Sequence, residues 1–175
     1  MNDGVVLTTE RLVLRRMQSA DAPAIHALAG NREVALNTLS IPHPYPEGAA
    51  EEWIERHGND AFAITLRDSG EFLGCIGIGV VANDQRGELG YWIGVPYWGK
   101  GYASEAANAL IGYAFESLAL NKVYASHFAR NPASGRVMLK LGMTYEGTLR
   151  QHHNKWGEYV DVAMYSILRS EWRAG

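Results

Sequence analysis

Alternating apolar and polar positions mark the expected strands of this chain. Residues 5–17 read VVLTTERLVLRRM, and their alternation places Leu12 and Leu14 on one face of a strand. Residues 61–67 and 72–81 are apolar runs joined by the turn sequence DSGE, which predicts a hairpin. Further strands are expected over residues 88–95, 122–129, 143–153 and 159–168.

Apolar residues at helical spacing predict about four helices between these strands. The first begins at an N-cap, Ser19, and the second ends at Gly58. The third covers residues 102–118, and the fourth runs from its cap, Asn131, to Gly142. This order predicts an α/β (α+β) domain, with about seven strands in a mostly antiparallel, mixed sheet.

Composition adds bounds on the class of protein. The 175 residues suit one domain over 1–175, and 47% of them are hydrophobic, enough for a sizeable core. The net charge of −3 disfavours a nucleic-acid partner. Cys75, the one cysteine, lies in an apolar run and is expected to be a small buried hydrophobe. Because neither a secretory signal nor a membrane-spanning run is present, we expect a cytoplasmic protein with no membrane partner.

The strongest chemical signal is YWGKGYASEA, residues 97–106. A strand, a short loop and a helix opened by Gly99 and Gly101 would present backbone N–H groups to an anion. A Walker loop requires Ser or Thr after Gly-Lys, and here Gly101 follows Lys100, so that motif fails. A dinucleotide fingerprint is weak, since serine replaces its last glycine. The remaining alternative is a glycine-rich turn that only permits close packing.

Two long motifs, GELGYWIGVPYWGKGYASEA and NPASGRVMLKLGMTYEGTLRQ, closely resemble the GNAT superfamily of acetyl-CoA-dependent N-acetyltransferases. More narrowly, the chain resembles the RimJ/RimL type, which acetylates ribosomal-protein N-termini. The resemblance covers essentially the whole chain, including TERLVLRRM. It implies the GNAT fold and direct transfer of the acetyl group to a primary amine, on a protein N-terminus or a small molecule, in a ternary complex without a metal. The alternative is a CoA-binding module without turnover, acting as a sensor or structural partner.

The resemblance also implies a cofactor site. The family binds the acetyl-CoA pyrophosphate on a Q/R-x-x-G-x-G/A loop, and Pro96 stands here where Gln or Arg is usual. The implied phosphate-binding residues are Trp98, Gly99, Lys100, Gly101, Tyr102 and Ala103. The implied pantetheine contacts are Ile93, Gly94, Val95, Asn131 and Ser134. Lys100 would add a cation near the phosphates, or would be a solvated loop lysine.

Acetyl transfer needs a neutral amine, donors for the carbonyl oxygen and a proton for the departing thiolate. Many family members use a tyrosine as the proton donor, but Met138 occupies that position. The RimL-type alternative is a serine three residues after the cap asparagine, here Ser134, which could also be only a capping hydroxyl. Glu88, at the start of its strand, matches a carboxylate that often serves as the base, although it could be only an exposed edge residue.

His153 is a second candidate base. RimL-like enzymes carry a glutamate at this position, and an imidazole, which titrates near pH 6.5, could replace it. If the strand continues regularly, His152 points to the opposite face, so only one of the pair can face a cleft, and a metal site is not expected. His127 is expected to be a packed histidine.

The acceptor side is implied by the resemblance to lie at the loop NTLSIPHPYPEG and the final hairpin turn. The expected wall residues supply aromatic surface with few charges: His43, Tyr45, Trp53 and Trp156. The sequence names no acceptor amine, and pairing into homodimers is a further implication of the family.

Overall fold

The computed structural model describes residues 4–58 and 60–173, which form two compact units. Unit 1 is Met1–Gly77 with Tyr91–Ala109, and unit 2 is Ile78–Gly90 with Leu110–Gly175. The described residues contain eight strands and five α-helices, and the hydrogen-bonded strand order is β1-β2-β3-β4-β5-β6-β8-β7. The expected α/β class with a mixed, mostly antiparallel sheet is confirmed, with one more strand and one more helix than predicted. The expectation of one domain over residues 1–175 stays a prediction.

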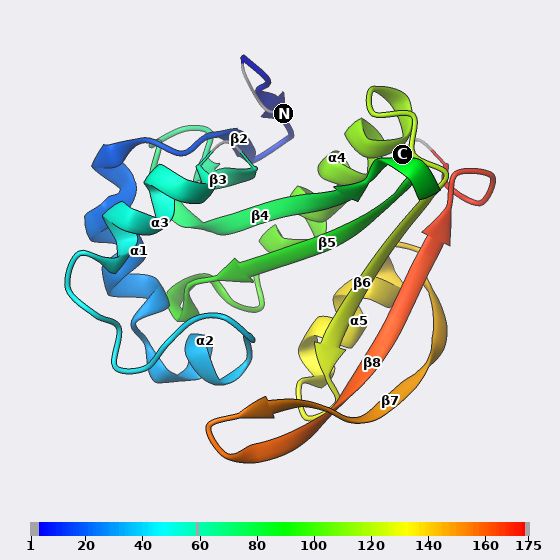
Figure 1. The fold of residues 1–175 in the computed structure, drawn as a ribbon. Helices are drawn as coiled ribbons and strands as arrows, with labels where there is room; N and C mark the ends of the chain where they lie inside the picture. The colour runs from blue at the N-terminus through cyan, green and yellow to red at the C-terminus, as the bar shows by residue number, and fades with distance from the viewer. Residues whose placement is uncertain (1–3, 59, 174–175) are drawn as a thin grey trace. The chain divides into compact units, whose positions relative to one another are not determined.

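Unit 1 holds the N-terminal strands and three helices (Figure 1). Its elements are β1 (Leu7–Thr8), β2 (Leu12–Arg16), α1 (Ala22–Ala29), α2 (Arg32–Leu36), α3 (Ala49–His57) and β3 (Ala61–Leu66). It also contains the first part of β4 (Phe72–Val81), the end of β5 (Arg86–Ile93), a 3-10 turn, η3 (Val95–Tyr97), and the start of α4 (Tyr102–Glu116). The strands β1, β2, β3 and β4 pair antiparallel in sequence order.

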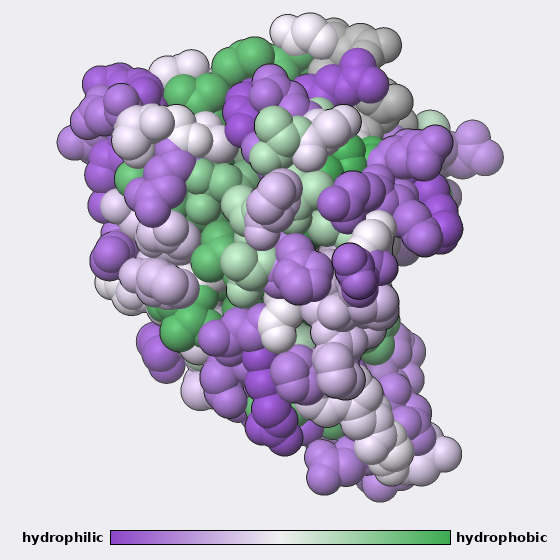
Figure 2. Space-filling view, turned by 90° about the vertical axis from the view of Figure 1, so that its left-hand side faces the viewer, coloured by the Kyte–Doolittle hydropathy of each residue, from purple (hydrophilic) through white to green (hydrophobic). Residues whose placement is uncertain are grey.

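The core of unit 1 lies between α1, α3 and the strands β3 and β4. Its buried side chains are Met17, Ala22, Ile25, Ala29, Ala50, Ala61, Ala63, Phe72 and Cys75. Burial raises the pKa of the Cys75 thiol, which confirms the expected buried hydrophobe. Figure 2 shows the side of the molecule that lies on the left in Figure 1. Polar residues cover most of that surface, and smaller apolar patches lie between them.

Three details of unit 1 differ from the sequence predictions. The expected single strand over residues 5–17 is a hairpin, because the Thr9 hydroxyl accepts a hydrogen bond from the Leu12 N–H at 3.0 Å and closes a turn. Ser19 is not a cap: it opens a 3-10 turn, Ser19–Asp21, that is capped by Gln18, and α1 follows with Asp21 as its N-cap. The short helix α2 was not predicted; its five residues give little periodic signal.

Unit 2 contains the C-terminal strands and α5. Its elements are the end of β4, the start of β5, the remainder of α4, β6 (Lys122–Phe128), α5 (Pro132–Lys140), β7 (Thr144–Lys155) and β8 (Glu158–Leu168). β5 pairs parallel with β6, with Glu88 opposite Tyr124, and β8 pairs antiparallel with both β6 and β7. Figure 1 shows β7 and β8 as a long, curved hairpin. No helix of the described residues is both long and apolar enough to cross a bilayer.

Candidate active site

The glycine-rich segment lies in unit 1, between the end of β5 and the start of α4. Gly99 and Gly101 have φ angles of +76° and +84°, a region that side chains disfavour, so glycine is favoured at both positions. The Glu105 N–H bonds to the Gly101 carbonyl at 3.1 Å and closes the first turn of α4. The N–H groups of residues 102–104 have no acceptor within the helix, because they belong to its first turn. The segment therefore has the local geometry of an anion-binding loop.

Hydrogen bonds within the segment hold its shape. The Trp98 indole N–H donates to the Ile93 carbonyl at 2.6 Å, across the 3-10 turn η3. The Gly94 N–H donates to the Leu73 carbonyl at 2.8 Å, which fixes the end of β5 against β4. A side chain on Gly94 would meet Leu28 at 2.8 Å, so α1 packs directly on this backbone. The loop is thus tied to β4 by a backbone hydrogen bond and packed against α1.

Arg11 and Glu105 link the β1–β2 turn to the first turn of α4. The Glu105 carboxylate accepts hydrogen bonds from the Thr9 hydroxyl at 2.6 Å, the Arg11 N–H at 2.8 Å and the Arg11 Nε at 2.7 Å. Burial alone would raise the pKa of Glu105, but these hydrogen bonds outweigh it and lower the pKa. Arg11 also donates to the Lys100 carbonyl at 3.0 Å and lies 4.7 Å above the ring of Tyr102.

Lys100 itself is exposed, and its ammonium lies 5.7 Å from the ring centroid of Tyr97. The Tyr97 hydroxyl in turn donates to Glu71 at 2.7 Å, which raises the pKa of the phenol. An exposed lysine beside an aromatic ring is compatible with either expected role, a phosphate-side cation or a solvated loop residue.

In unit 2, Asn131 and Ser134 open helix α5 as expected. The Asn131 side chain caps the helix by accepting the Ser134 N–H at 3.4 Å. Ser134 is half-buried, while Met138 is 1% exposed and packs in the core, where it contributes no proton donor. Because Asn131 supplies the cap, the Ser134 hydroxyl is not needed as the N-cap group.

Glu88 lies exposed on β5, directly across the parallel pairing from Tyr124 on β6. The Tyr124 hydroxyl donates to a Glu88 carboxylate oxygen at 3.5 Å. Burial and the charge of Glu88 raise the pKa of Tyr124, so the phenol keeps its proton at neutral pH. Tyr124 was not singled out from the sequence; only the strand register places it beside Glu88.

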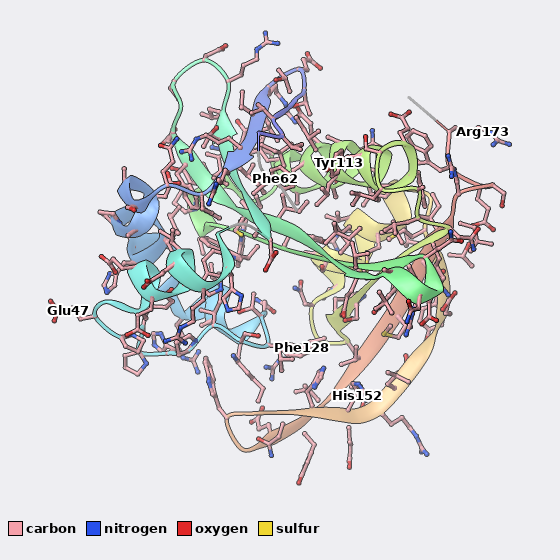
Figure 3. All side chains as sticks on the ribbon, turned by 45° about the horizontal axis from the view of Figure 1, so that its top comes forward. Glu47, Phe62, Tyr113, Phe128, His152 and Arg173 are labelled. Carbon is pink, nitrogen blue, oxygen red and sulfur yellow. The ribbon has the colours of Figure 1, made fainter. Side chains whose placement is uncertain are left out.

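The histidine pair on β7 departs from the sequence prediction. His152 and His153 do not point to opposite faces, since their ring centroids are 4.6 Å apart. The register of β7 shifts between Leu149 and His153, and Gln151 takes a positive φ of +49°, so regular alternation is lost there. Figure 3 shows His152 on the curved β7 strand, and His153 packs against Phe128.

His127 is packed, as expected. Its Nδ1 donates to the Phe128 carbonyl at 2.8 Å, because a carbonyl oxygen can only accept, and its ring stacks on Tyr165. Nε2 is buried and faces Gly135 of α5, where a Cβ would lie only 2.8 Å away.

Of the expected acceptor-side residues of unit 1, two pack against the core and one is exposed. Tyr45 and Trp53 are half-buried against the α1–α3 core, and burial raises the pKa of Tyr45. His43 is exposed, with its Nδ1 3.2 Å from the Gly30 carbonyl. Figure 3 shows Glu47, in the same loop, pointing away from the fold. In unit 2, Trp156 is 46% exposed in the β7–β8 turn, with the Lys155 ammonium 4.6 Å from its ring.

Comparisons with known proteins identify the family. Residues 11–144 match the family model described as acetyltransferase (GNAT) domain. The uncharacterized N-acetyltransferase YoaA of Bacillus subtilis (strain 168) is 36% identical over 94% of this chain and 97% of its own length. The [Ribosomal protein uS5]-alanine N-acetyltransferase of Escherichia coli (strain K12) is 29% identical over 98% of this chain and 94% of its own length.

Solved structures agree with these sequence matches. A GNAT-family acetyltransferase from Bacillus anthracis superposes with a TM-score of 0.89 at 27% identity, over 95% of this chain and 100% of that one. A spermidine N-acetyltransferase from Vibrio cholerae, in complex with CoA and spermine, superposes with a TM-score of 0.79 at 26% identity, over 93% and 98% of the two chains. With the glycine loop at the start of α4 and the eight-stranded mixed sheet, these matches make the chain a member of the GNAT family and an acetyl-CoA-dependent N-acetyltransferase.

Proposed function

We propose that the chain is a RimJ/RimL-type acetyltransferase whose acceptor is a primary amine, with the α-amine of a protein N-terminus as the leading candidate. The observation that carries the proposal is the loop Trp98–Ala103, in which two glycines with positive φ lead into the first turn of α4. The relative that acetylates an alanine of ribosomal protein uS5 supports a protein acceptor. The spermidine acetyltransferase supports the broader class of primary amines.

The loop residues fit the phosphates of acetyl-CoA. A Cβ on Gly99 would meet no atom within 4 Å, so the space beside this backbone is open, and the missing side chain lets a ligand approach closely. The first-turn N–H groups of α4 supply donors, and the helix dipole favours negative charge. Residues Gly99, Gly101, Tyr102 and Ala103 would hold the phosphates, with Lys100 as a nearby cation.

Acetyl-CoA, when bound, supplies the acetyl group as a thioester. The side chains proposed for the chemistry lie in unit 2. Glu88, whose carboxylate faces solvent and accepts from Tyr124, would take a proton from the acceptor's ammonium group, directly or through water, so that the neutral amine can attack the thioester. The Ser134 hydroxyl, in the first turn of α5, would donate a hydrogen bond to the departing thiolate. His153, packed against Phe128, is the second candidate for the base.

The acceptor surface is proposed to include the aromatic residues His43, Tyr45, Trp53 and Trp156. Tyr45 and Trp53 are held by the core of unit 1, so they would form a fixed wall and would not need to be ordered on binding. His43 and Trp156 are exposed and could contact the acceptor directly.

The deciding experiment measures thiol release from acetyl-CoA with a panel of acceptors: peptides with different N-terminal residues, polyamines, aminoglycosides and free amino acids. Stimulation by peptides that begin with a small residue supports the proposal. Stimulation by polyamines alone would replace the protein acceptor with a small amine. Failure of CoA to bind, measured by calorimetry on the same preparation, would contradict the assignment of the loop.

A further inference from the structure

Arg11 makes an unusual set of contacts for a residue in a hairpin turn. Its Nε and its Nη2 lie 2.7 and 2.6 Å from the same Glu105 oxygen, while Nη1 donates to the Lys100 carbonyl at 3.0 Å. Glu105 is held in addition by the Thr9 hydroxyl and by the Arg11 backbone N–H. The guanidinium is therefore fixed from two sides and stacked on the ring of Tyr102.

The Lys100 carbonyl is the point at which Arg11 acts on the loop. The peptide bond between Lys100 and Gly101 is trans, since the cis bond found in the described residues is His43–Pro44. In a planar trans peptide the C=O and the following N–H point in opposite directions. A Lys100 carbonyl that points at Arg11 therefore directs the Gly101 N–H away from Arg11.

Gly101 has a φ of +84°. Glycine can adopt several backbone conformations at little cost, so without a hydrogen bond to the Lys100 carbonyl the peptide plane between Lys100 and Gly101 could rotate. On its other side, the Gly101 carbonyl is fixed by the Glu105 N–H within α4. Arg11 and α4 together hold both peptide planes that flank Gly101.

We infer that Arg11 is a positioning residue for the cofactor: by holding the Lys100 carbonyl, it aims the Gly101 N–H at the phosphates of acetyl-CoA before the ligand arrives. This inference rests on the proposed function of the loop. Arginine suits the role because its planar fork can bond a carboxylate and a carbonyl at the same time, whereas a lysine ammonium is a single point donor group on a flexible stem.

A simpler role for Arg11 would be to neutralise Glu105. The N-terminus of α4 attracts an anionic ligand through the helix dipole. An unpaired Glu105 carboxylate in the first turn would repel the same ligand and oppose that attraction. The two roles make different predictions when both charges are removed together, so a double variant separates them.

The test uses the full chain and CoA as the probe in titration calorimetry. Positioning predicts that Arg11→Met, Arg11→Lys and the double variant Arg11→Met with Glu105→Gln each bind CoA about tenfold more weakly than the unaltered protein. The KM for acetyl-CoA should rise by the same factor, with kcat little changed. Arg56→Met is the matched control, because it removes an arginine whose ion pair, with Glu52, lies within α3 and on its surface.

A second readout needs no ligand. In the free protein, backbone amides of residues 98–104 should exchange with solvent faster in Arg11→Met than in Arg56→Met, because the loop has lost its restraint. Unchanged amide exchange in the rest of the chain shows that the variant is folded outside the loop.

Each outcome decides between the roles. Full CoA affinity in the double variant, or in Arg11→Lys, would overturn positioning and leave only charge neutralisation. Unaltered affinity in Arg11→Met would overturn both roles. If the unaltered protein itself does not bind CoA, the proposed function of the loop fails, a result distinguishable from all of these.

Discussion

Arg15 and Asp21 form a two-pronged ion pair at the entry to helix α1. The two guanidinium Nη atoms of Arg15 donate to the two carboxylate oxygens of Asp21 at 2.9 and 2.7 Å, and only 7% of the Asp21 side chain is exposed. The hydrogen bond and the charge of Asp21 raise the pKa of Arg15 despite its burial. Because Asp21 also accepts the Gln18 N–H, the pair joins β2 to the start of α1.

Removing the cation should destabilise the fold strongly. Arg15→Met leaves the Asp21 carboxylate buried without its partner, and breaking such a pair costs roughly 3–5 kcal/mol of unfolding free energy. Arg56→Met, which breaks the exposed pair with Glu52, should cost at most about 1 kcal/mol. Urea unfolding of the unaltered protein, Arg15→Met and Arg56→Met gives the three unfolding free energies. Equal losses of unfolding free energy in the two variants would show that burial of the Arg15–Asp21 pair does not matter.

Glu105 should make stability depend on acid pH. Its pKa in the folded protein is lowered from the ordinary 4.5, so its contribution is present above that value and is lost as the pH falls through the lower, folded-state pKa. In Glu105→Gln this contribution is absent at every pH. The difference in unfolding free energy between the unaltered protein and Glu105→Gln should therefore shrink as the pH falls below about 4.5. A difference that stays constant from pH 6 to pH 3 would rule out the Thr9 and Arg11 hydrogen bonds as its source.

Gly99 and Gly70 offer a matched pair of substitutions. Both have a positive φ, +76° and +74°, and a Cβ at either would meet no atom within 4 Å. Gly99→Ala and Gly70→Ala should each lose about 1–2 kcal/mol of stability from backbone strain. Only Gly99→Ala should also weaken CoA binding in calorimetry, because Gly70 lies in the β3–β4 turn. Equal CoA affinity in the two variants would argue against the loop as the phosphate site.

Ser134 and Asn131 separate catalysis from helix capping. Ser134→Ala should lower kcat by about 10–100-fold if its hydroxyl assists the thiolate, with little change in melting temperature. Asn131→Ala removes the side chain that accepts the Ser134 N–H and should cost about 1 kcal/mol of stability. Steady-state kinetics and thermal unfolding of both variants decide the matter. A large stability loss in Ser134→Ala with unchanged kcat would make the hydroxyl structural.

Glu88 and His153 are distinguished by the effect of their substitution on turnover. Glu88→Gln should lower kcat/KM by roughly 10²–10⁴-fold, the usual contribution of a general base, whereas His153→Gln should leave it little changed. Tyr124→Phe should have a smaller effect than Glu88→Gln, since it removes only a 3.5 Å hydrogen bond to the carboxylate. If His153→Gln lowers kcat/KM by that factor and Glu88→Gln does not, the base is His153 instead.

Local signals in the sequence predicted the elements that are fixed locally. Helix α5 has its cap, its proline and its terminal glycine within a dozen residues, and its bounds were predicted correctly. Arg11 and Glu105 are separated by 94 positions in the sequence, so no local pattern predicts their contact. The orientation of His152 and His153 depends on the left-handed conformation of Gln151, a residue that ordinarily continues a strand. The backbone elements that carry the candidate site were therefore predictable from local sequence, whereas side-chain contacts between distant segments were not, and the roles of the site residues stay predictions.

The hydrogen bond between Trp98 and the Ile93 carbonyl gives the protein its own optical reporter. The indole is held at a fixed place in the glycine-rich segment, yet 44% of the residue is exposed to water. Indole fluorescence responds to the polarity around the ring, so a ligand that covers Trp98 shifts its emission without any added label. Because the chain has five tryptophans, the Trp98 contribution is the difference in emission between the unaltered protein and Trp98→Phe, and that difference reports occupancy of the segment.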